Sequence, residues 1–235
     1  DITGSEILNE KREFQFLRGP IFANIILADE INRTPPKTQA ALLEAMQEKT
    51  VTINGQLHQL PNPFFVLATQ NPIEQEGTYA LPEAQLDRFM FNVFLDYPTY
   101  EEEIEIIKKT TSNHKVEMNK IIHSSDILAF QELVRKTPVA DNVIEYAVKL
   151  VSKTRPDSPF ATEEIKKYIE FGAGPRAGQF LIIGAKAHAL LNGKYSPDIE
   201  NVKAIALNIL RHRLIKNYRA EAEGVKIESI IAGIL

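Results

Sequence analysis

The sequence contains no cysteine, and this absence excludes disulfide bonds, zinc sites with cysteine ligands and thiol catalysis. It has no uninterrupted apolar stretch long enough to span a bilayer, and its first residues do not have the pattern of a signal peptide. Both absences fit the cytoplasm, which is the location that we expect. Positive charge is not in excess either, since 27 lysines and arginines stand against 31 aspartates and glutamates. We expect no nucleic-acid partner, because sequence-independent binding to phosphates needs a basic face.

The 235 residues have the composition of a globular protein, with 44% hydrophobic and 25% charged residues. The first residue is Asp1 rather than Met, and we expect the chain to be part of a longer protein. Apolar runs and helical patterns alternate over residues 1–97, whereas helical patterns alone fill residues 98–235. The pattern predicts an α/β part followed by an all-helical part, with the boundary near Tyr97 and Pro98.

Three short apolar runs predict strands of a parallel sheet. They cover residues 24–28, 63–69 and 89–95. Continuous apolar runs of this length are typical of strands that are buried on both faces. A helix is expected between the first two runs, with Thr34 as its cap and Pro35 in its first turn.

Asn54 and Gly55 predict a β-hairpin between two segments of strand-like sequence. A two-residue loop would place Ile53 opposite Gln56, and a three-residue loop would place it opposite Leu57. The apolar match favours the longer loop.

Further elements follow from local signals. A second hairpin is expected from Ile7 to Phe16, with a charged tip. Apolar residues at helical spacing predict helices that include residues 104–107, 127–134, 143–151 and 202–210, and Ser196-Pro197 is expected to start the last of them.

Two adjacent carboxylates, Asp29 and Glu30, follow the first predicted strand. Ligands of parallel α/β sheets bind beyond the carboxyl ends of the strands. One carboxylate could hold Mg²⁺ there while the other orients the water that attacks a nucleotide. Alternatively, Asp29 caps the next turn and Glu30 is solvated. Taken alone, the pattern leaves both interpretations open.

Three further polar residues stand where chemistry could use them. Asn71 follows the second predicted strand, Arg88 precedes the third, and Arg176 follows the break at Gly172–Pro175. The amide could contact a γ-phosphate, and each arginine could stabilise phosphate charge. Taken alone, each also has a plainer explanation. Asn71 could belong to a turn, Arg88 could pair with Asp87 or Glu83, and Arg176 could be a surface loop residue.

Several segments, taken in order, resemble the MoxR family of AAA+ ATPases. They are residues 22–33 (FANIILADEINR), 39–46 (QAALLEAM), 68–72 (ATQNP), 81–89 (LPEAQLDRF) and, near the end, 218–224 (YRAEAEG). The resemblance covers nearly the whole chain. It implies an α/β fold, namely the αβα core of a P-loop NTPase (AAA+) truncated at its N-terminus, followed by an all-helical lid domain.

The resemblance also implies a role for each matched residue. Asp29 and Glu30 would be the Walker B pair, with Asp29 at the metal and Glu30 as the catalytic carboxylate. Asn71 would be sensor 1, Arg88 the arginine finger offered to the next subunit, and Arg176 the nucleotide-contacting sensor 2 of the lid. The implied cofactors are ATP and Mg²⁺.

The chain departs from the family pattern in two places. No Gly-x-x-x-x-Gly-Lys-Ser/Thr loop is present in the sequence, and its backbone N–H groups and lysine would cradle the phosphates. We therefore expect this chain to bind ATP poorly by itself. In addition, Gly174 stands where the family usually has a small polar residue.

The function implied by the resemblance is ATP hydrolysis that drives conformational change in a homo-oligomeric, hexameric ring. The family also implies a chaperone-like role toward client proteins, some of which contain von Willebrand factor A domains. Two alternatives are a scaffold subunit that does not hydrolyse ATP and a motor of the magnesium-chelatase type. The acidic balance and the sequences around Asp29 and Tyr218 count against the second alternative.

Overall fold

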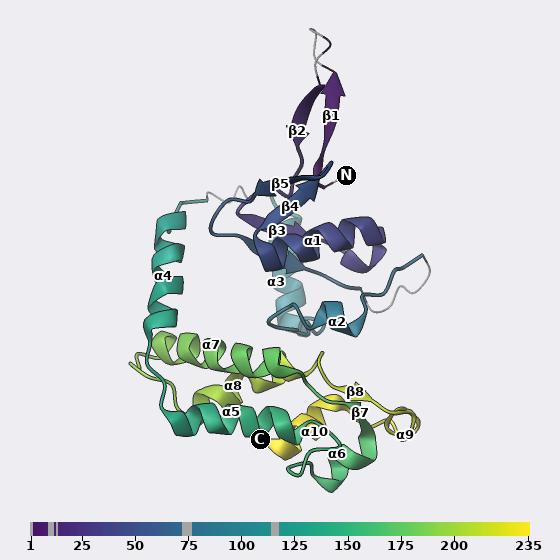
Figure 1. Ribbon diagram of the computed structural model, residues 1–235, viewed down its shortest axis with the longest axis vertical. Helices are drawn as coiled ribbons and strands as arrows, with labels where there is room; N and C mark the ends of the chain where they lie inside the picture. The colour runs from purple at the N-terminus through teal and green to yellow at the C-terminus, as the bar shows by residue number, and fades with distance from the viewer. Residues whose placement is uncertain (1, 9–11, 13, 72–76, 114–117) are drawn as a thin grey trace.

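The structure is a computed structural model that describes the chain except residues 1, 9–11, 13, 72–76 and 114–117. Its elements form an α/β part and a helical part, joined on one side by helix α4 (Ser124–Lys136) (Figure 1). Each part has a hydrophobic core of its own. The predicted succession of an α/β part and a mainly helical part is confirmed.

The α/β part is organised around two parallel strands, β3 (Ile25–Ala28) and β6 (Phe65–Ala68). Both strands were predicted, and their register places Ala28 beside Ala68. A one-turn 3-10 helix, η1 (Ile31–Arg33), leads from β3 into helix α1 (Pro36–Glu48). Their apolar side chains share the core of this part, whose buried members are Ile21, Ile31, Leu42, Leu43, Ala45, Val51, Leu60, Phe64 and Leu81.

The prediction that these strands are buried on both faces is wrong for this chain. Ile25 and Leu27 of β3 are 58% and 65% exposed, and Phe65 of β6 is 56% exposed. Ile26 and Val66, which are paired with each other in register, pack against the core. One face of the strand pair is therefore covered and the other carries a stripe of exposed apolar side chains.

The third predicted strand, residues 89–95, is also wrong. This segment has no strand hydrogen bonds within the described chain, and Leu95 at its end is 92% exposed. A strand exists only where a neighbour accepts and donates its backbone hydrogen bonds, so an apolar run cannot form one by itself.

Two hairpins flank the strand pair. The predicted hairpin near the N-terminus consists of β1 (Gly4–Leu8) and β2 (Phe14–Arg18), which project from the α/β part (Figure 1). Most of its charged tip lies outside the described residues. The second hairpin consists of β4 (Thr50–Ile53) and β5 (Gln56–Gln59).

The favoured three-residue loop in the second hairpin is wrong, because Ile53 pairs with Gln56 across a two-residue loop. Asn54 and Gly55 both have positive φ, at 49° and 78°. This is the left-handed pair that a type I′ turn requires and that matches the twist of the strands. Leu57 is 64% exposed, so pairing it with Ile53 would bury little additional apolar surface.

The predicted helix cap at Thr34 is wrong by one residue. Helix α1 begins at Pro36 with Pro35 as its N-cap, and the Thr34 hydroxyl donates instead to the Ile31 carbonyl at 2.7 Å. Thr34 therefore closes the 3-10 turn before the helix.

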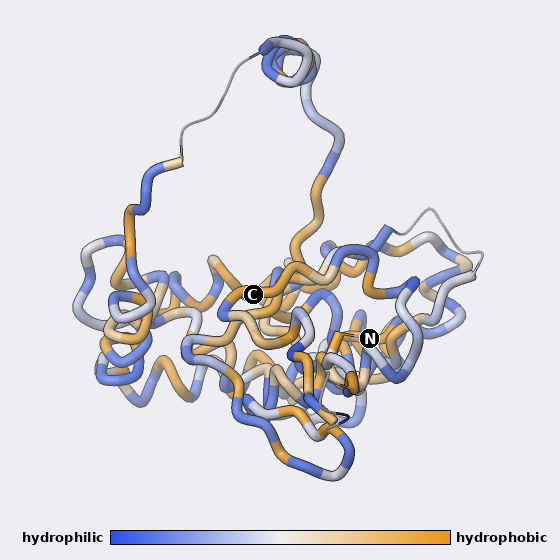
Figure 2. The backbone as a smooth tube through the Cα atoms, turned by 90° about the horizontal axis from the view of Figure 1, so that it is seen from above, coloured by the Kyte–Doolittle hydropathy of each residue, from blue (hydrophilic) through white to orange (hydrophobic). Residues whose placement is uncertain are grey.

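Two helices follow strand β6 in the chain. Helix α2 (Glu83–Leu86) is one turn long, and helix α3 (Tyr100–Thr110) begins with a capping box between Thr99 and Glu102. Helix α3 stands away from the rest of the molecule (Figure 2), and none of its residues is buried.

The helical part packs its helices around one core. After α4 it contains α5 (Asp141–Lys153), α6 (Glu163–Tyr168), α7 (Pro175–Leu191), α8 (Ile199–Leu210), α9 (Tyr218–Ala222) and α10 (Ile227–Ile234). Helices α7 and α8 lie against each other, and Gly184 is at their contact, where a Cβ would come 2.6 Å from Ile205 Cδ1 and displace the end of that side chain. Within the described residues no helix is long and apolar enough to cross a membrane.

Two details of this part differ from the predictions. It is not purely helical, because β7 (Ile169–Phe171) and β8 (Ile215–Lys216) form a short antiparallel pair. The last predicted helix starts at Ile199 rather than at Ser196-Pro197. Asp198 and Asn201 form a reciprocal capping box there, and this satisfies more of the free N–H groups of the helix end than a serine alone.

Candidate functional site

Asp29, Glu30 and Thr69 meet at the carboxyl ends of the two parallel strands. The Thr69 hydroxyl donates to Asp29 Oδ1, and the Thr69 hydroxyl oxygen accepts the backbone N–H of Glu30 at 2.9 Å. The ladder continues past the strand ends, since Ile31 N donates to the Thr69 carbonyl at 3.0 Å. One threonine thus joins both carboxylate residues to the neighbouring strand.

The backbone at Glu30 turns sharply out of the strand direction. Its φ of 49° lies in the left-handed region, which is uncommon for a residue with a side chain. Its carboxylate, 39% exposed, forms an ion pair with Arg33 at 3.3 Å. The chain therefore leaves the strand direction directly after Asp29, whose carboxylate accepts the Thr69 hydroxyl.

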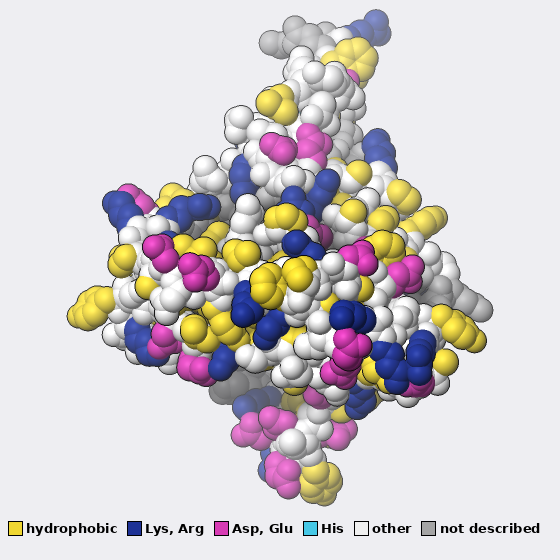
Figure 3. All heavy atoms as spheres, turned by 60° about the horizontal axis from the view of Figure 1, so that its bottom comes forward, with side chains coloured by type: hydrophobic (Ala, Val, Ile, Leu, Met, Phe, Trp, Pro, Cys, Tyr) yellow, Lys and Arg dark blue, Asp and Glu magenta, His cyan; other side chains and the backbone are white. Residues whose placement is uncertain are grey.

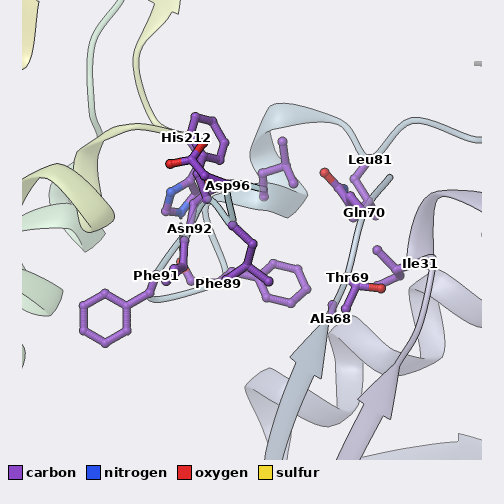
Figure 4. A pocket seen from close by; sticks show the side chains of 14 residues that line it. Ile31, Ala68, Thr69, Gln70, Leu81, Phe89, Phe91, Asn92, Asp96 and His212 are labelled. Atoms are coloured by element: carbon purple, nitrogen blue, oxygen red, sulfur yellow. Dashed lines mark hydrogen bonds between the residues drawn. The ribbon is translucent and has the colours of Figure 1, made fainter. Parts of the chain in front are cut away.

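A cavity of about 510 Å³ opens beside these strand ends. Thr69 and Gln70 line one side of it, and Phe89, Asn92 and His212 line the other (Figure 4). His212 follows helix α8, so the cavity reaches from the strand ends to the junction between the two parts.

The donor set at the strand ends fits a Mg²⁺–nucleotide better than a bare metal ion. Among the described residues no group of three or more His, Cys, Asp or Glu could hold a metal. Mg²⁺ in nucleotide sites takes one or two protein carboxylates and completes its coordination with phosphates and water. The exposed Asp29 can supply such a single ligand.

The junction between the two parts centres on Asp87, just past α2. Arg176 Nη1, near the start of α7, donates to Asp87 Oδ2 at 2.6 Å, and Arg213 Nε donates to Oδ1 at 2.8 Å. Asp87 thus pairs with two arginines of the helical part rather than with its neighbour Arg88. In the described part of the chain, the half-buried Arg88 forms no ion pair with Asp87 or Glu83, so that alternative is wrong.

Arg213 binds the α/β part mainly through main-chain oxygens. Its guanidinium donates to the carbonyls of Asp87, Phe89 and Met90 and, within the helical part, to that of Ile209. The side chain is only 1% exposed. Burial lowers the pKa of the Arg213 guanidinium, and the hydrogen bond and charge of Asp87 oppose this effect.

Two regions of the sequence match models of known families. Residues 1–91 match the ATPase family associated with various cellular activities (AAA), and residues 161–234 match the AAA lid domain. Chaperone MoxR1 of Mycobacterium tuberculosis (strain ATCC 25618 / H37Rv) is 41% identical over 236 residues, which are 100% of this chain and 62% of MoxR1. The chain belongs to the MoxR family of AAA+ ATPases.

Two other proteins are similar to this MoxR-family chain over its whole length. The uncharacterised protein YeaC of Bacillus subtilis (strain 168) is 41% identical over 237 residues, and the chain covers 71% of it. The crystal structure of a candidate ATPase from Cytophaga hutchinsonii ATCC 33406 superposes with a TM-score of 0.92 at 44% identity, and the chain covers 72% of it. The fold is therefore an AAA+ domain followed by an AAA lid.

The residues predicted from the sequence fall into two groups in this MoxR-family chain. Asp29, Glu30 and Asn71 lie at the ends of the β3–β6 pair, with Asn71 half-buried; Pro72 of the same motif is outside the described residues. Arg176 lies at the junction bound to Asp87, and Arg88 is the residue that follows Asp87 in the chain. The cavity is lined by neighbours of both groups, among them Thr69 and Phe89, and by none of the five predicted residues.

The departure at Gly174 changes little in the structure. Gly174 is the N-cap of α7 with φ −78°, a conformation open to any residue, and a Cβ there would meet no atom within 4 Å. The glycine therefore leaves the start of α7, and with it Arg176, where a small polar residue would also place them.

Sequence reasoning missed Thr69 and Arg213 and saw Asp87 only as a partner for Arg88. Thr69 lies inside the 68–72 motif, in which Asn71 was the predicted site residue. Arg213 had no local signal, because its partners in the α/β part lie more than 120 positions earlier in the chain.

His212 gives the junction a dependence on pH. Burial, and to a smaller extent the neighbouring Arg213 charge, lower the pKa of this imidazole to about 4. Its Nε2 donates to the Phe89 carbonyl at 3.0 Å, so Nε2 carries the proton, and among the described residues the buried Nδ1 has no hydrogen-bond partner. The folded protein thus holds His212 neutral.

We expect the folded protein to lose stability as the pH falls from about 6.5 to about 4. In this window the unfolded chain binds a proton at His212 and the folded chain does not, so acid favours unfolding by up to about 3 kcal/mol. Thermal unfolding of wild type and His212→Gln at pH 7 and 4.5 measures the effect, and the variant should lose less. His188→Gln removes a histidine of the same part away from the junction and serves as the control. Equal acid losses in wild type and His212→Gln would contradict this assignment.

Proposed function

We propose that this chain carries the hydrolytic half of a Mg²⁺-dependent ATPase site within a homo-oligomeric ring. The observation that carries the proposal is the Thr69 hydroxyl, which bonds both the Asp29 carboxylate and the Glu30 backbone at the ends of parallel strands. Fixed carboxylates at this edge of a sheet are what nucleotide hydrolysis requires.

The two carboxylates divide the work. Asp29 would hold the Mg²⁺, directly or through water, and a bound Mg²⁺ neutralises charge on the phosphates. Glu30 would orient the attacking water and accept its proton. The backbone turns out of the strand at Glu30, where φ is 49°. Its ion pair with Arg33 is exposed at 39% and 51%, so water competes for both partners and the carboxylate is available.

Three further residues would read the state of the phosphates. Asn71, on the loop after β6, would contact the attacking water and the γ-phosphate as sensor 1. Arg88 would reach the nucleotide of a neighbouring subunit as an arginine finger, and Arg176 would bind phosphate as sensor 2. We place the division between core and lid at residues 97 and 98, within the segment between α2 and α3.

The phosphate-binding loop is the part of the site that these 235 residues do not contain. Without a Gly-x-x-x-x-Gly-Lys-Ser/Thr sequence, the chain alone should bind ATP poorly and be inactive. The second candidate function is a scaffold subunit that does not hydrolyse ATP, and ATP turnover of the complete protein distinguishes the two.

We propose a chaperone-like role in the assembly or activation of client complexes, in a hexameric ring located in the cytoplasm. Its support is the 41% identity to MoxR1, which is named a chaperone. Clients with von Willebrand factor A domains are part of this proposal. Nucleic acid is not, because basic and acidic side chains are interspersed on the face in Figure 3 and the net charge is −4.

Replacement of Thr69 tests the observation behind the proposal. In the complete ATPase we expect Thr69→Val to lower kcat about tenfold to hundredfold, because the Asp29 carboxylate and the Glu30 backbone lose their common partner. Steady-state turnover measures the loss. Thr69→Ser keeps the hydroxyl and should stay within about twofold of wild type. Wild-type turnover in the valine variant would count against the proposed site.

A further inference from the structure

The Asp87 carboxylate receives one arginine on each of its oxygens. Arg213 Nε lies 2.8 Å from Oδ1, and Arg176 Nη1 lies 2.6 Å from Oδ2. The two arginines differ in exposure, since the Arg213 side chain is 1% exposed and that of Arg176 is 35% exposed. One arginine is thus part of the interior and the other faces the surface.

The buried arginine fixes the carboxylate. Besides Asp87, Arg213 binds the carbonyl oxygens of Phe89 and Met90, and its guanidinium lies 5.1 Å from the centre of the Phe180 ring on α7. These contacts hold the Arg213 guanidinium in one position, and Asp87 Oδ1 is bound to that fixed guanidinium. Asp87 is therefore a rigid support for whatever binds its second oxygen.

The exposed arginine is held at one nitrogen only. Within the part of the chain that the structure describes, Asp87 is the one hydrogen-bond partner of the Arg176 side chain. A guanidinium has five N–H donors in a planar fork, so several of them remain for a further acceptor. Two guanidinium charges also share a single carboxylate, which leaves this cluster with a net positive charge suited to an anion.

We infer that Asp87 is a positioning residue for ATP hydrolysis. Held by Arg213, it fixes one edge of the Arg176 guanidinium and leaves the remaining donors for a phosphate oxygen. The inference rests on the proposed function, in which Arg176 contacts the nucleotide. An arginine aligned in advance loses less side-chain freedom when the phosphate binds, and it reaches the developing charge in the correct orientation.

A surface ion pair alone does not account for this arrangement. Partly exposed pairs contribute little to stability, and Asp87 is already neutralised by Arg213. The Arg176 side chain is therefore not needed to compensate a buried charge, whereas the carboxylate is needed to orient Arg176.

A double-mutant cycle in the complete ATPase tests the inference. We expect Asp87→Asn to lower kcat about tenfold when Arg176 is present, and by less than about twofold in an Arg176→Ala background, because the carboxylate acts through that arginine. Glu83→Gln removes one negative charge from α2, the short helix that precedes Asp87, and should leave kcat unchanged. Asp87→Glu keeps the charge on a longer side chain, so the same cycle can be run if the asparagine variant does not fold.

The outcomes separate the inference from the proposed function. Equal losses of kcat in both backgrounds, or no loss with Asp87→Asn, would overturn the positioning role, since a purely structural effect does not depend on Arg176. Failure of the proposed function has a different signature, because Glu30→Gln would then leave turnover intact whatever the Asp87 variants do.

Discussion

Glu30→Gln is expected to lower ATP turnover of the complete ATPase at least about a hundredfold, because the amide cannot accept the proton of the attacking water. Glutamine has the shape of glutamate, and the backbone bond from Glu30 to Thr69 does not depend on the side chain. The Asp29 carboxylate also remains in place. ATP affinity should therefore stay within a few-fold of wild type, as equilibrium binding and turnover measured side by side will show.

Glu48→Gln provides the matched control for this prediction. Glu48 is exposed at the end of α1, in the same part of the molecule, and its substitution should change neither quantity. Turnover near the wild-type rate in Glu30→Gln would refute the assignment of Glu30 as the catalytic carboxylate. Loss of both binding and turnover would instead indicate that the side chain supports the structure of the strand ends.

Arg88→Ala is expected to lower turnover about a thousandfold, the size of effect that a charge-stabilising arginine finger has on phosphoryl transfer. If the arginine acts on the neighbouring subunit, mixing Arg88→Ala subunits with Glu30→Gln subunits should restore activity. With equal amounts and random assembly, about one interface in four pairs an intact Glu30 with an intact Arg88. Turnover of the mixture should then approach a quarter of the wild-type value.

Arg135→Ala serves as the control for the mixing experiment, because Arg135 is an exposed arginine on α4 away from the junction. When Arg135→Ala subunits are mixed with Glu30→Gln subunits, turnover should equal that of the same amount of wild-type subunits diluted with Glu30→Gln subunits. A mixture of Arg88→Ala and Glu30→Gln that remains inactive would show that Arg88 does not act across a subunit boundary.

Sequence patterns predicted the elements whose causes are local. The strand pair β3 and β6 follows from compact apolar runs, and helices α5 and α8 follow from apolar residues at helical spacing. Asp29, Glu30 and Asn71 could be placed together because the carboxyl ends of parallel strands share one edge.

The predictions failed where two local preferences oppose each other, or where an element needs a partner from elsewhere in the chain. Residues 89–95 are apolar enough for a strand but have no strand neighbour within the described chain. In the β4–β5 hairpin, the left-handed preference of Asn54 and Gly55 outweighed the apolar match that Leu57 offered. The contact between Asp87 and Arg213 joins residues far apart in the sequence, and no periodicity carries that information.

Arg213 binds mostly main-chain oxygens at the junction, and this has a consequence for how the protein can vary. Carbonyl groups are the same whatever side chain a residue carries, so the interaction does not depend on the side-chain identity of Phe89 or Met90. Only the arginine itself and Asp87 are required by it. Substitutions at Phe89 and Met90 can therefore leave these bonds between lid and core in place, whatever they change in the packing of their own side chains.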